Sequence, residues 1–475
     1  MTTAAAHEEE GQTSRIEENG RAAPRKVRRF VIFGVAVTAM TMANLDQSIV
    51  ATALPTLRND LHAPLYWAGW TITAYQFGMV IAMPVAGRIS DQFGRRRVFL
   101  ICLALFTVSS LLCATASNIY VLVAFRALQA LGGGAFTPSA IGIITDHFGS
   151  NRDRAVGMIS STVPIGTLTG PVLGGVIIAY WSWRGVFLIN IPIGITVFLL
   201  TLRFVPRSRP LEVPKADLRG VTLLAGMLLP LMYGITTLGK GTTPIWSAQF
   251  LLPEALAVTF GVLFIRHSRV ATSPIIPMRL LTQGGFGRMN LINYLYGGCA
   301  LGIGALIPLY AEERYHFHSL EAGTVLSARA VGVLLIASTT AFLIRRIGYR
   351  RPMIAGFTVA AIGMVFLALS PHGLSTYAWI AIGAAMMGIG NGMAAPSTNN
   401  AMLHMAPGEA GSISGLRGMF RQFGAISVIS VTTAIVSRSS NEGLALGHIF
   451  LTLGVLVTVL VVPLAFTVED HRGGW

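Results

Sequence analysis

The chain is poor in charged residues. Asp, Glu, Lys and Arg make up 12% of its 475 positions, whereas hydrophobic residues make up 53%. Soluble domains contain about 25% charged residues, so this chain has too little polar surface to cover a globule of its size. Apolar runs of about 20 residues recur from end to end, the length that crosses a bilayer core as a helix. The composition therefore predicts an all-α polytopic membrane protein.

Groups that commonly carry cofactor or redox chemistry are also scarce. The three cysteines, Cys102, Cys113 and Cys299, all lie inside apolar runs, where cysteine acts as a small core residue. The histidines show no metal-ligand spacing, and no phosphate-binding G-x-x-x-x-G-K-[ST] loop is present. We expect no metal, no cofactor, no use of ATP within this chain and no enzyme activity.

Acidic residues are outnumbered, 20 against 35 basic ones. A nucleic-acid surface would need clustered basic residues, whereas membrane proteins place Lys and Arg in short cytoplasmic loops. The apolar runs predict fourteen spans, near 30–56, 66–87, 98–117, 119–145, 154–180, 185–204, 218–239, 247–265, 286–311, 320–344, 353–370, 375–400, 411–436 and 446–467.

The loops between these spans alternate in charge. The termini and every second loop hold 26 Lys and Arg, the opposite loops hold five, and four arginines fall within spans. This asymmetry predicts that both termini are cytoplasmic and that no nucleic acid is bound.

The order of spans and loops suggests a division of the chain. Residues 1–28 have mixed charge and no apolar stretch, and predict a disordered cytoplasmic tail. Residues 29–206 and 284–467 predict two six-helix bundles, and 468–475 a second tail. Residues 207–283 predict a two-helix insert; Glu254 is the one acid within its helix pair, so we expect the pair to face lipid, outside the transport pathway.

A charged loop between the second and third predicted spans carries the first specific motif. Its pattern is Gly87-x-x-x-Asp91-x-x-Gly94-Arg95-Arg96. A positive cytoplasmic anchor explains the arginines but not the glycines and the aspartate at this spacing. The pattern resembles the loop signature of the major facilitator superfamily, which implies a latch at the cytoplasmic gate between two six-helix halves. The second-half counterpart, 345–351, keeps Gly348 but lacks the aspartate, so only the first copy is expected to form a charged latch.

Further stretches resemble the fourteen-helix drug:proton antiporter family. They are Asn44 to Pro55, Arg126 to Pro138, Gly166 to Gly175 and Trp181 to Gly194. The third matches the antiporter signature G-x-x-x-G-P-x-x-G-G at every fixed position. It comprises Gly166, Gly170, Pro171, Gly174 and Gly175. Glycines spaced by four allow close helix packing and a proline bends a helix, so we expect a close, bent contact between this span and the other half. Ordinary helix packing is the alternative.

Asp46 is the sole acid inside the first predicted span. A carboxylate at that depth is costly and should have a partner. Arg126 in the fourth span is the best candidate, since the resemblance makes these helices neighbours. We expect Asp46 to carry a coupling proton and Arg126 to tune it; a static pair that fixes helix packing is the alternative.

Substrate contacts are expected from aromatic and polar residues in an apolar cavity, which suit bulky lipophilic ligands. Helix packing is the alternative for each. Glu312 and the adjacent Glu313 are either solvated at the outer mouth, or they attract cationic substrates or carry a second proton. Arg329 would pair with an acidic substrate or with a cluster of carbonyls. The candidates are Asn44, Trp70, Tyr75, Gln76, Gln129, Asn293, Tyr294, Glu312, Arg329 and Asn399.

The resemblance implies a monomeric antiporter of the plasma (inner) membrane that exports lipophilic drugs or related small molecules. Proton entry would drive alternating access between the two bundles. The alternative is a dedicated exporter of one endogenous metabolite: an antibiotic, a siderophore or a lipid. The expected partners are a small lipophilic substrate, protons and the lipid bilayer.

Overall fold

The computed structural model describes residues 3–148, 166, 169–207, 217–239, 243–282, 285–405 and 410–470. All regular elements in this part are helical, so the all-α prediction is confirmed. The elements before residue 207 are α1 (Thr3–Asp60), α2 (Leu65–Ala68), α3 (Trp70–Phe93), α4 (Arg95–Thr115), α5 (Ile119–Gly134), α6 (Phe136–Phe148), α8 (Gly185–Leu188) and α9 (Asn190–Phe204). They are followed by α10 (Leu218–Leu238), α11 (Ala248–Val270) and α12 (Arg279–Thr282).

The remaining elements include two π-helical segments, written η2 and η4. They are α13 (Phe286–Gly297), η2 (Gly298–Ile303), α14 (Gly304–Tyr315), α15 (Ser319–Ile347), α16 (Arg350–Ala368), α17 (Thr376–Met405), α18 (Ala410–Val436), α19 (Glu442–Leu456), η4 (Val457–Val461) and α20 (Val462–Phe466).

Twelve helices of the described residues are long and apolar enough to cross a membrane. A shorter apolar helix, Thr169–Tyr180, lies at the fifth predicted span, whose earlier residues fall outside the described part apart from Gly166. Helix α3 lies at the second predicted span and is not among the twelve. A multi-pass membrane protein is confirmed, while the count of fourteen stays a prediction.

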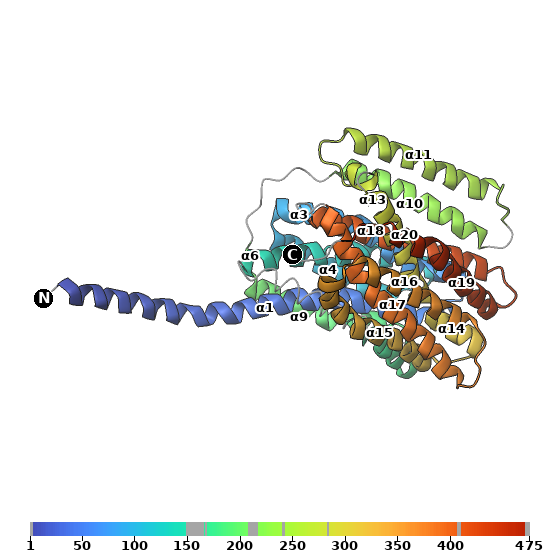
Figure 1. The fold of residues 1–475 in the computed structure, drawn as a ribbon, viewed down its shortest axis with the longest axis horizontal. Helices are drawn as coiled ribbons and strands as arrows, with labels where there is room; N and C mark the ends of the chain where they lie inside the picture. Colours follow the sequence, from blue (N-terminus) through green and yellow to red (C-terminus); the bar gives the residue numbers. More distant parts are fainter. Residues whose placement is uncertain are drawn as a thin grey trace.

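Helix α1 differs from the prediction at its start. It begins at Thr3, so residues predicted as a disordered tail form a single helix that projects from the bundle (Figure 1). The segment is rich in Ala, Glu and Arg, which are strong helix formers, and a prediction based on the missing apolar stretch overlooked that propensity.

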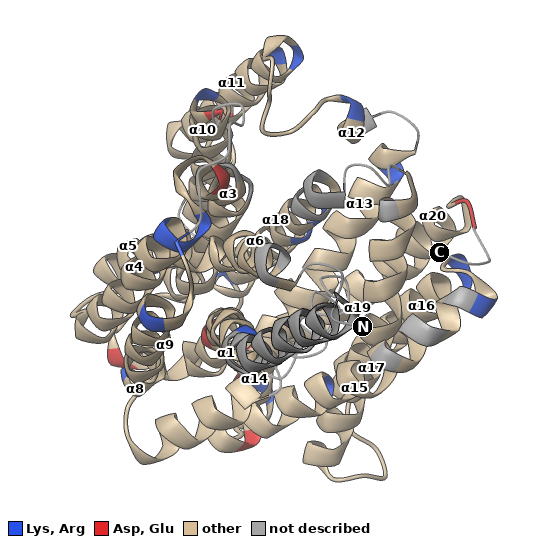
Figure 2. Cartoon of the chain, turned by 90° about the vertical axis from the view of Figure 1, so that its left-hand side faces the viewer, with Lys and Arg blue, Asp and Glu red and all other residues tan. Residues whose placement is uncertain are grey.

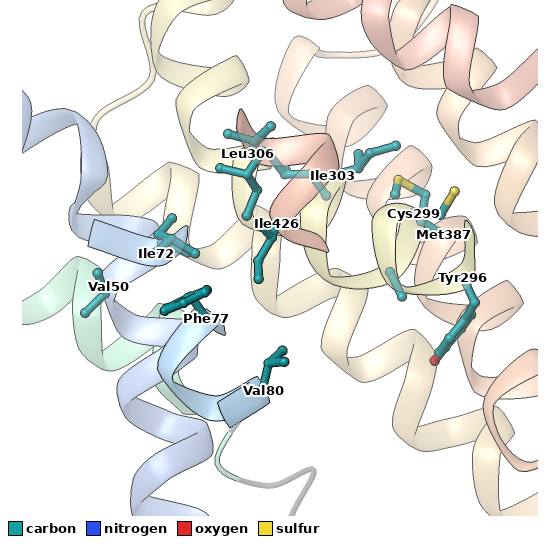
Figure 3. Packing of buried hydrophobic residues seen from close by; sticks show 14 of the residues in the cluster. Val50, Ile72, Phe77, Val80, Tyr296, Cys299, Ile303, Leu306, Met387 and Ile426 are labelled. Carbon is teal, nitrogen blue, oxygen red and sulfur yellow. The ribbon is translucent and has the colours of Figure 1, made fainter. Parts of the chain in front are cut away.

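The helices before residue 207 pack mainly on one another, as do α13 to α20; we call these the first half and the second half. The end of the bundle from which the N-terminal segment projects is the tail end, and the opposite end, where α1 finishes, is the Arg58 end. The halves meet where α3 packs on α18 and where α1 packs on α14 and α15. In Figure 3, Ile426 of α18 lies across from Ile72 and Phe77 of α3.

The two halves share only part of the hydrophobic core. One buried cluster combines residues 45–80 of the first half with residues throughout the second half. A separate cluster, which includes Ile32, Ala43, Phe99 and Ile143, contains first-half residues alone and lies toward the tail end. Among the described residues, the halves therefore share a core toward the Arg58 end.

The insert helices α10 and α11 lie side by side at one edge of the bundle (Figure 1). Most of α11 is exposed, as predicted for a lipid-facing helix. Helix α10 instead packs on both α3 and α18. The Trp70 indole nitrogen donates to the Thr236 hydroxyl at 2.6 Å, and Arg438, at the end of α18, donates to the carbonyls of Leu238 and Thr243. The insert thus covers the junction between the halves at the Arg58 end, which its apolar composition did not reveal.

Asp217 fixes the opposite end of the insert. Its carboxylate caps α10 by accepting the Gly220 N–H at 2.8 Å, and it also accepts from His267 of α11 and from the Ile275 backbone. Burial raises the pKa of Asp217, but these hydrogen bonds outweigh burial and hold the pKa below its ordinary value. A carboxylate that accepts a backbone N–H in the first turn caps the helix and stabilises its end.

We expect the Trp70–Thr236 hydrogen bond to hold α10 on the bundle. Trp70→Phe and Thr236→Val should each lower the free energy of unfolding by about 1 kcal/mol, and together by less than the sum, since they remove the same bond. Thermal or denaturant unfolding of the purified protein measures this. Trp246→Phe is the matched control, because Trp246 is 76% exposed; strictly additive effects of the first two substitutions would contradict the prediction.

Candidate functional site

Asp46 is the centre of a buried polar network in the first half. Its side chain is 0% exposed. Arg126 Nη1 lies 2.6 Å from one carboxylate oxygen, and Gln129 Nε2 and Asn190 Nδ2 donate to the other at 3.0 and 2.7 Å. The structure thus brings together the two residues predicted to couple protons, together with two amides.

Arg126 joins α1, α3 and α5. Besides Asp46, it donates to the Thr71 carbonyl at 3.0 Å and to Gln129 Oε1 at 2.5 Å. Its guanidinium lies 4.2 Å from the centre of the Tyr75 ring, a distance at which a cation is attracted by the ring face. The charge is therefore compensated by an ion pair, two further acceptors and a ring face, as a charge inside an apolar bundle requires.

Two members of this network were missed by sequence reasoning. Asn190 and Ser110 are both fully buried. Ser110 accepts hydrogen bonds from Asn190 and Gln129 and donates to the Phe187 carbonyl, so α4, α5 and α9 are tied to Asp46. The available signal was a single amide inside the apolar run "FLINIPIG".

The donors and acceptors around Asp46 define what the site can do. Each of its three partners is an N–H donor, so a carboxylate satisfies all of them. A protonated carboxyl group is itself a donor at one oxygen. A proton on the oxygen that faces Arg126 would remove the negative charge that Arg126 pairs with and turn an acceptor into a donor, so it would weaken the contact between the two side chains.

The structure places the predicted substrate residues in different surroundings. Gln129 and Tyr75 belong to the Asp46 network, and Trp70 holds α10. Gln76 is buried and its Oε1 has no partner in the described chain. Asn44 and Asn293 donate to carbonyls one turn back in their own helices.

The remaining candidates lie in the second half. Tyr294, Asn399 and Glu312 are half-buried. Glu313, next to Glu312, is paired with Arg58. Arg329 donates through Nη2 to the Ala300 carbonyl in η2, which agrees with the carbonyl partner considered from the sequence.

The predicted gating loop forms a tight corner between α3 and α4. Gly94 has φ +93°, a backbone conformation that favours glycine. Asp91 pairs with Arg95 at 3.0 Å, Arg95 also donates to the Gly142 carbonyl, and Arg96 donates to the Leu202 carbonyl. These contacts tie α3 and α4 to α6 and α9 within the first half; a latch between the halves stays a prediction. Gly87 lies beside Pro138.

The second-half loop obtains its missing acid from elsewhere in the chain. Gly348 has φ +79°, and the carboxylate of Asp470 lies against it and accepts the Arg350 N–H at 3.1 Å. An acid at the start of α16 interacts favourably with the helix dipole. The C-terminal segment therefore supplies a carboxylate to the loop, which the motif spacing could not show.

The glycines of the antiporter motif face α1 rather than the second half. A Cβ on Gly166, Gly170 or Gly174 would lie within 3 Å of Thr41, Ser48 or Ile49, all in α1. The contact predicted with the other half is made instead by Pro171 and Gly175, which lie against Gly323 and Leu320 of α15. The four-residue glycine spacing and the offset of Pro171 and Gly175 put these residues on different faces of one helix.

An ion cluster joins the halves at the Arg58 end. Arg58 Nη1 lies 2.6 Å from Glu442 and 3.1 Å from Glu313, and its Nη2 makes a second bond to Glu442 at 2.8 Å. The sequence placed Glu313 at the outer mouth but gave no sign of its partner, because the three residues come from α1, α14 and α19.

We expect Gly170→Leu to be incompatible with the α1 contact. A Cβ there would overlap Ser48 Oγ and stand 3.2 Å from the Leu45 carbonyl, and overpacking of this kind costs about 1–3 kcal/mol. Unfolding of the purified variant should reveal the loss, and Gly170→Ala should be partly rescued by Ser48→Ala. Gly34→Ala is the control, since no atom lies within 4 Å of that Cβ; a wild-type unfolding curve for Gly170→Leu would refute the packing.

We expect Arg58→Glu to separate the halves at the Arg58 end, because it leaves three carboxylates together. The double substitution Arg58→Glu with Glu442→Arg should restore part of the contact. Pulsed electron resonance between spin labels at Asn59 and Ser440, both exposed, in a background without the native cysteines, measures the distance. Equal distance distributions in all three proteins would rule out a gate function for the cluster.

Comparisons with known proteins agree with this architecture. The sequence matches the model of the Major Facilitator Superfamily over residues 36–429. The multidrug resistance protein B homolog of Mycobacterium tuberculosis (strain ATCC 25618 / H37Rv) is 29% identical over 409 residues, which cover 85% of this chain and 75% of that protein. The cephamycin export protein CmcT of Amycolatopsis lactamdurans is 30% identical over 438 residues, 90% of each chain.

Solved structures share the fold at low sequence identity. A POT family transporter in complex with 5-aminolevulinic acid has a TM-score of 0.67 at 13% identity, over 91% of this chain and 96% of that one. The xylose transporter XylE from E. coli, in a partially occluded inward open conformation, has a TM-score of 0.63 at 14% identity, over 93% of this chain and 100% of that one. The family match, which spans most of the sequence, shows that the chain belongs to the major facilitator superfamily of membrane transporters.

Proposed function

We propose that the chain is a proton-coupled antiporter that exports lipophilic small molecules across the plasma membrane by alternating access. In this proposal both termini and the tail end face the cytoplasm. The observation that carries the proposal is the Asp46 site, a fully buried carboxylate on a membrane-spanning helix. Ionisable residues at such depth mark proton and substrate pathways in transporters.

The donor geometry suggests how proton binding is linked to movement. A proton on Asp46 removes the counter-charge of Arg126 and replaces an acceptor with a donor. Arg126 keeps its bonds to Thr71 and Gln129, so it remains with α3 and α5 while α1 is released. Since α1 also packs on α14 and α15, its displacement is transmitted to the second half.

The contacts between the halves support alternating access. The ion cluster around Arg58, the Pro171–Gly323 approach and the shared core all lie toward the Arg58 end. The first half has a core of its own toward the tail end. This arrangement fits a transporter closed at the Arg58 end, which reopens there when the two halves rock about a central site.

The names of relatives support an export function but do not say whether this chain exports many compounds or one. They include multidrug resistance proteins, and also a cephamycin export protein and a tetracenomycin C resistance and export protein of Streptomyces glaucescens. A dedicated exporter of one endogenous metabolite therefore fits as well. In a deletion strain, sensitisation to many compounds would favour a drug exporter, and accumulation of one metabolite would favour the dedicated exporter.

We expect Asp46→Asn to abolish proton-driven uptake of substrate into inverted vesicles. One proton moving down 100 mV supplies about 2.3 kcal/mol, which corresponds to roughly 50-fold accumulation, and that gradient should be lost. Substrate exchange without a pH gradient should persist, because the asparagine can still accept hydrogen bonds from Gln129 and Asn190. Glu321→Gln, an exposed acid at the start of α15, is the control. Undiminished proton-driven accumulation by Asp46→Asn would end the proposal.

A further inference from the structure

Three arginines of the second half lie inside membrane-spanning helices. Arg417 and Arg421 are four residues apart on α18, so they share one face of the helix. Arg329 lies on α15, and Tyr296 of α13 is close enough to interact electrostatically with both Arg329 and Arg417. Two helices far apart in the sequence therefore bring arginines near the same residue of α13.

Helix α18 lies at the junction of the two halves. Gly418 approaches Met83 of α3, while the Arg421 carbonyl lies against Gly297 of α13. Figure 2 shows α18 near the middle of the bundle with a basic segment on its surface. The arginines of α18 are thus placed where major facilitator halves enclose a substrate.

The three arginines have no acidic partner among the residues that the structure describes. Neither Arg417 nor Arg421 forms an ion pair or a hydrogen bond with any residue in the described ranges, and the Nε atoms of all three arginines are enclosed without an acceptor. Arg329 is anchored by one bond to the Ala300 carbonyl. All three residues nevertheless keep some accessible surface.

The stretches of sequence that carry these arginines contain no carboxylate. Residues 322–408 and 410–441 contain no Asp or Glu, and neither do residues 286–311. Asp46 in the first half is already paired with Arg126. A buried charge without a counter-charge is costly in a membrane protein, and guanidinium groups pair with carboxylates and phosphates through two parallel hydrogen bonds.

We infer that the transported molecule carries an acidic group, and that Arg417, Arg421 and Arg329 form the site that binds it. The ligand class is a lipophilic molecule with a carboxylate, sulfonate or phosphate. This inference rests on the proposed function, since it names the cargo of the proposed exporter. A permanently cationic drug is excluded by the same charges, which would repel it.

Binding to the purified full-length protein tests the inference without any gradient. In nanodiscs, 1-naphthylacetate should bind at least about tenfold more tightly than its neutral methyl ester or the cation 1-naphthylmethylammonium. The double variant Arg417→Gln with Arg421→Gln should lose this preference while its affinity for the ester stays unchanged, which shows that the fold is intact. Lysine at both positions should recover part of the preference.

Arg346→Gln is the matched control, because it removes the same charge at an exposed position of α15. Equal binding of acid and ester, tighter binding of the cation, or an unchanged preference in the double variant would each overturn the inference. An anionic lipid headgroup could supply the same chemistry. If phosphatidylglycerol in the nanodiscs competes with 1-naphthylacetate and transport by the double variant is unchanged, lipid fills the site and the inference fails.

The two proposals can fail separately. If the wild type shows no proton-driven transport but binds the acid selectively, proton coupling is rejected and the anion site is kept. Proton-driven export of neutral or cationic compounds at equal rates by the wild type and the double variant would reject the anion site and keep the antiporter.

Discussion

The cost of a charge inside an apolar bundle governs this structure. Asp46 and Arg126 neutralise each other, and Gln129, Asn190, the Thr71 carbonyl and the face of Tyr75 make further contacts with the pair. Each of these groups comes from a different position on α1, α3, α5 or α9, so the charge pair determines how four helices of the first half are set against one another. At this pair a single proton would change the balance of donors and acceptors.

Close packing through small residues would transmit a change at the Asp46–Arg126 pair to the rest of the half. Gly166, Gly170 and Gly174 allow their helix to lie directly against α1, and Pro171 and Gly175 present a neighbouring face of that helix to α15. One helix is therefore in contact both with α1, which carries Asp46, and with the second half. Interfaces of this kind have little slack, because even one added carbon atom would overlap a neighbour, so a shift of α1 is passed on rather than absorbed.

The sequence allowed the chemistry of the first half to be predicted better than its geometry. A single acid in the first span and a single arginine in the fourth imply a pair, since each would be costly alone. Asn190 gave no comparable signal, because an amide in an apolar run can bond either to the backbone of its own helix or to a neighbouring helix. Only the packing of α9 on α4 decides between these two partners. The glycine spacing predicted a close helix contact but not its partner, and the missing aspartate of the second loop could not be traced to Asp470, 120 residues away. The apolar composition of α10 likewise concealed its hydrogen bond to Trp70.

The two halves differ in how their buried charges are balanced. The first half contains a neutral pair that a proton can unbalance. The second half contains three arginines inside its helices, and residues 286–311, 322–408 and 410–441 contain no Asp or Glu. Water can solvate those arginines while the central region is open, but closure around an empty site would strip the water away and leave the charges without partners. An acidic cargo supplies the missing partner and makes closure electrostatically acceptable. The arginines would then do more than select the cargo, because they would oppose the rocking of a transporter that carries neither cargo nor proton. In the proposed antiport cycle the return step follows proton binding at Asp46, which releases α1 from Arg126.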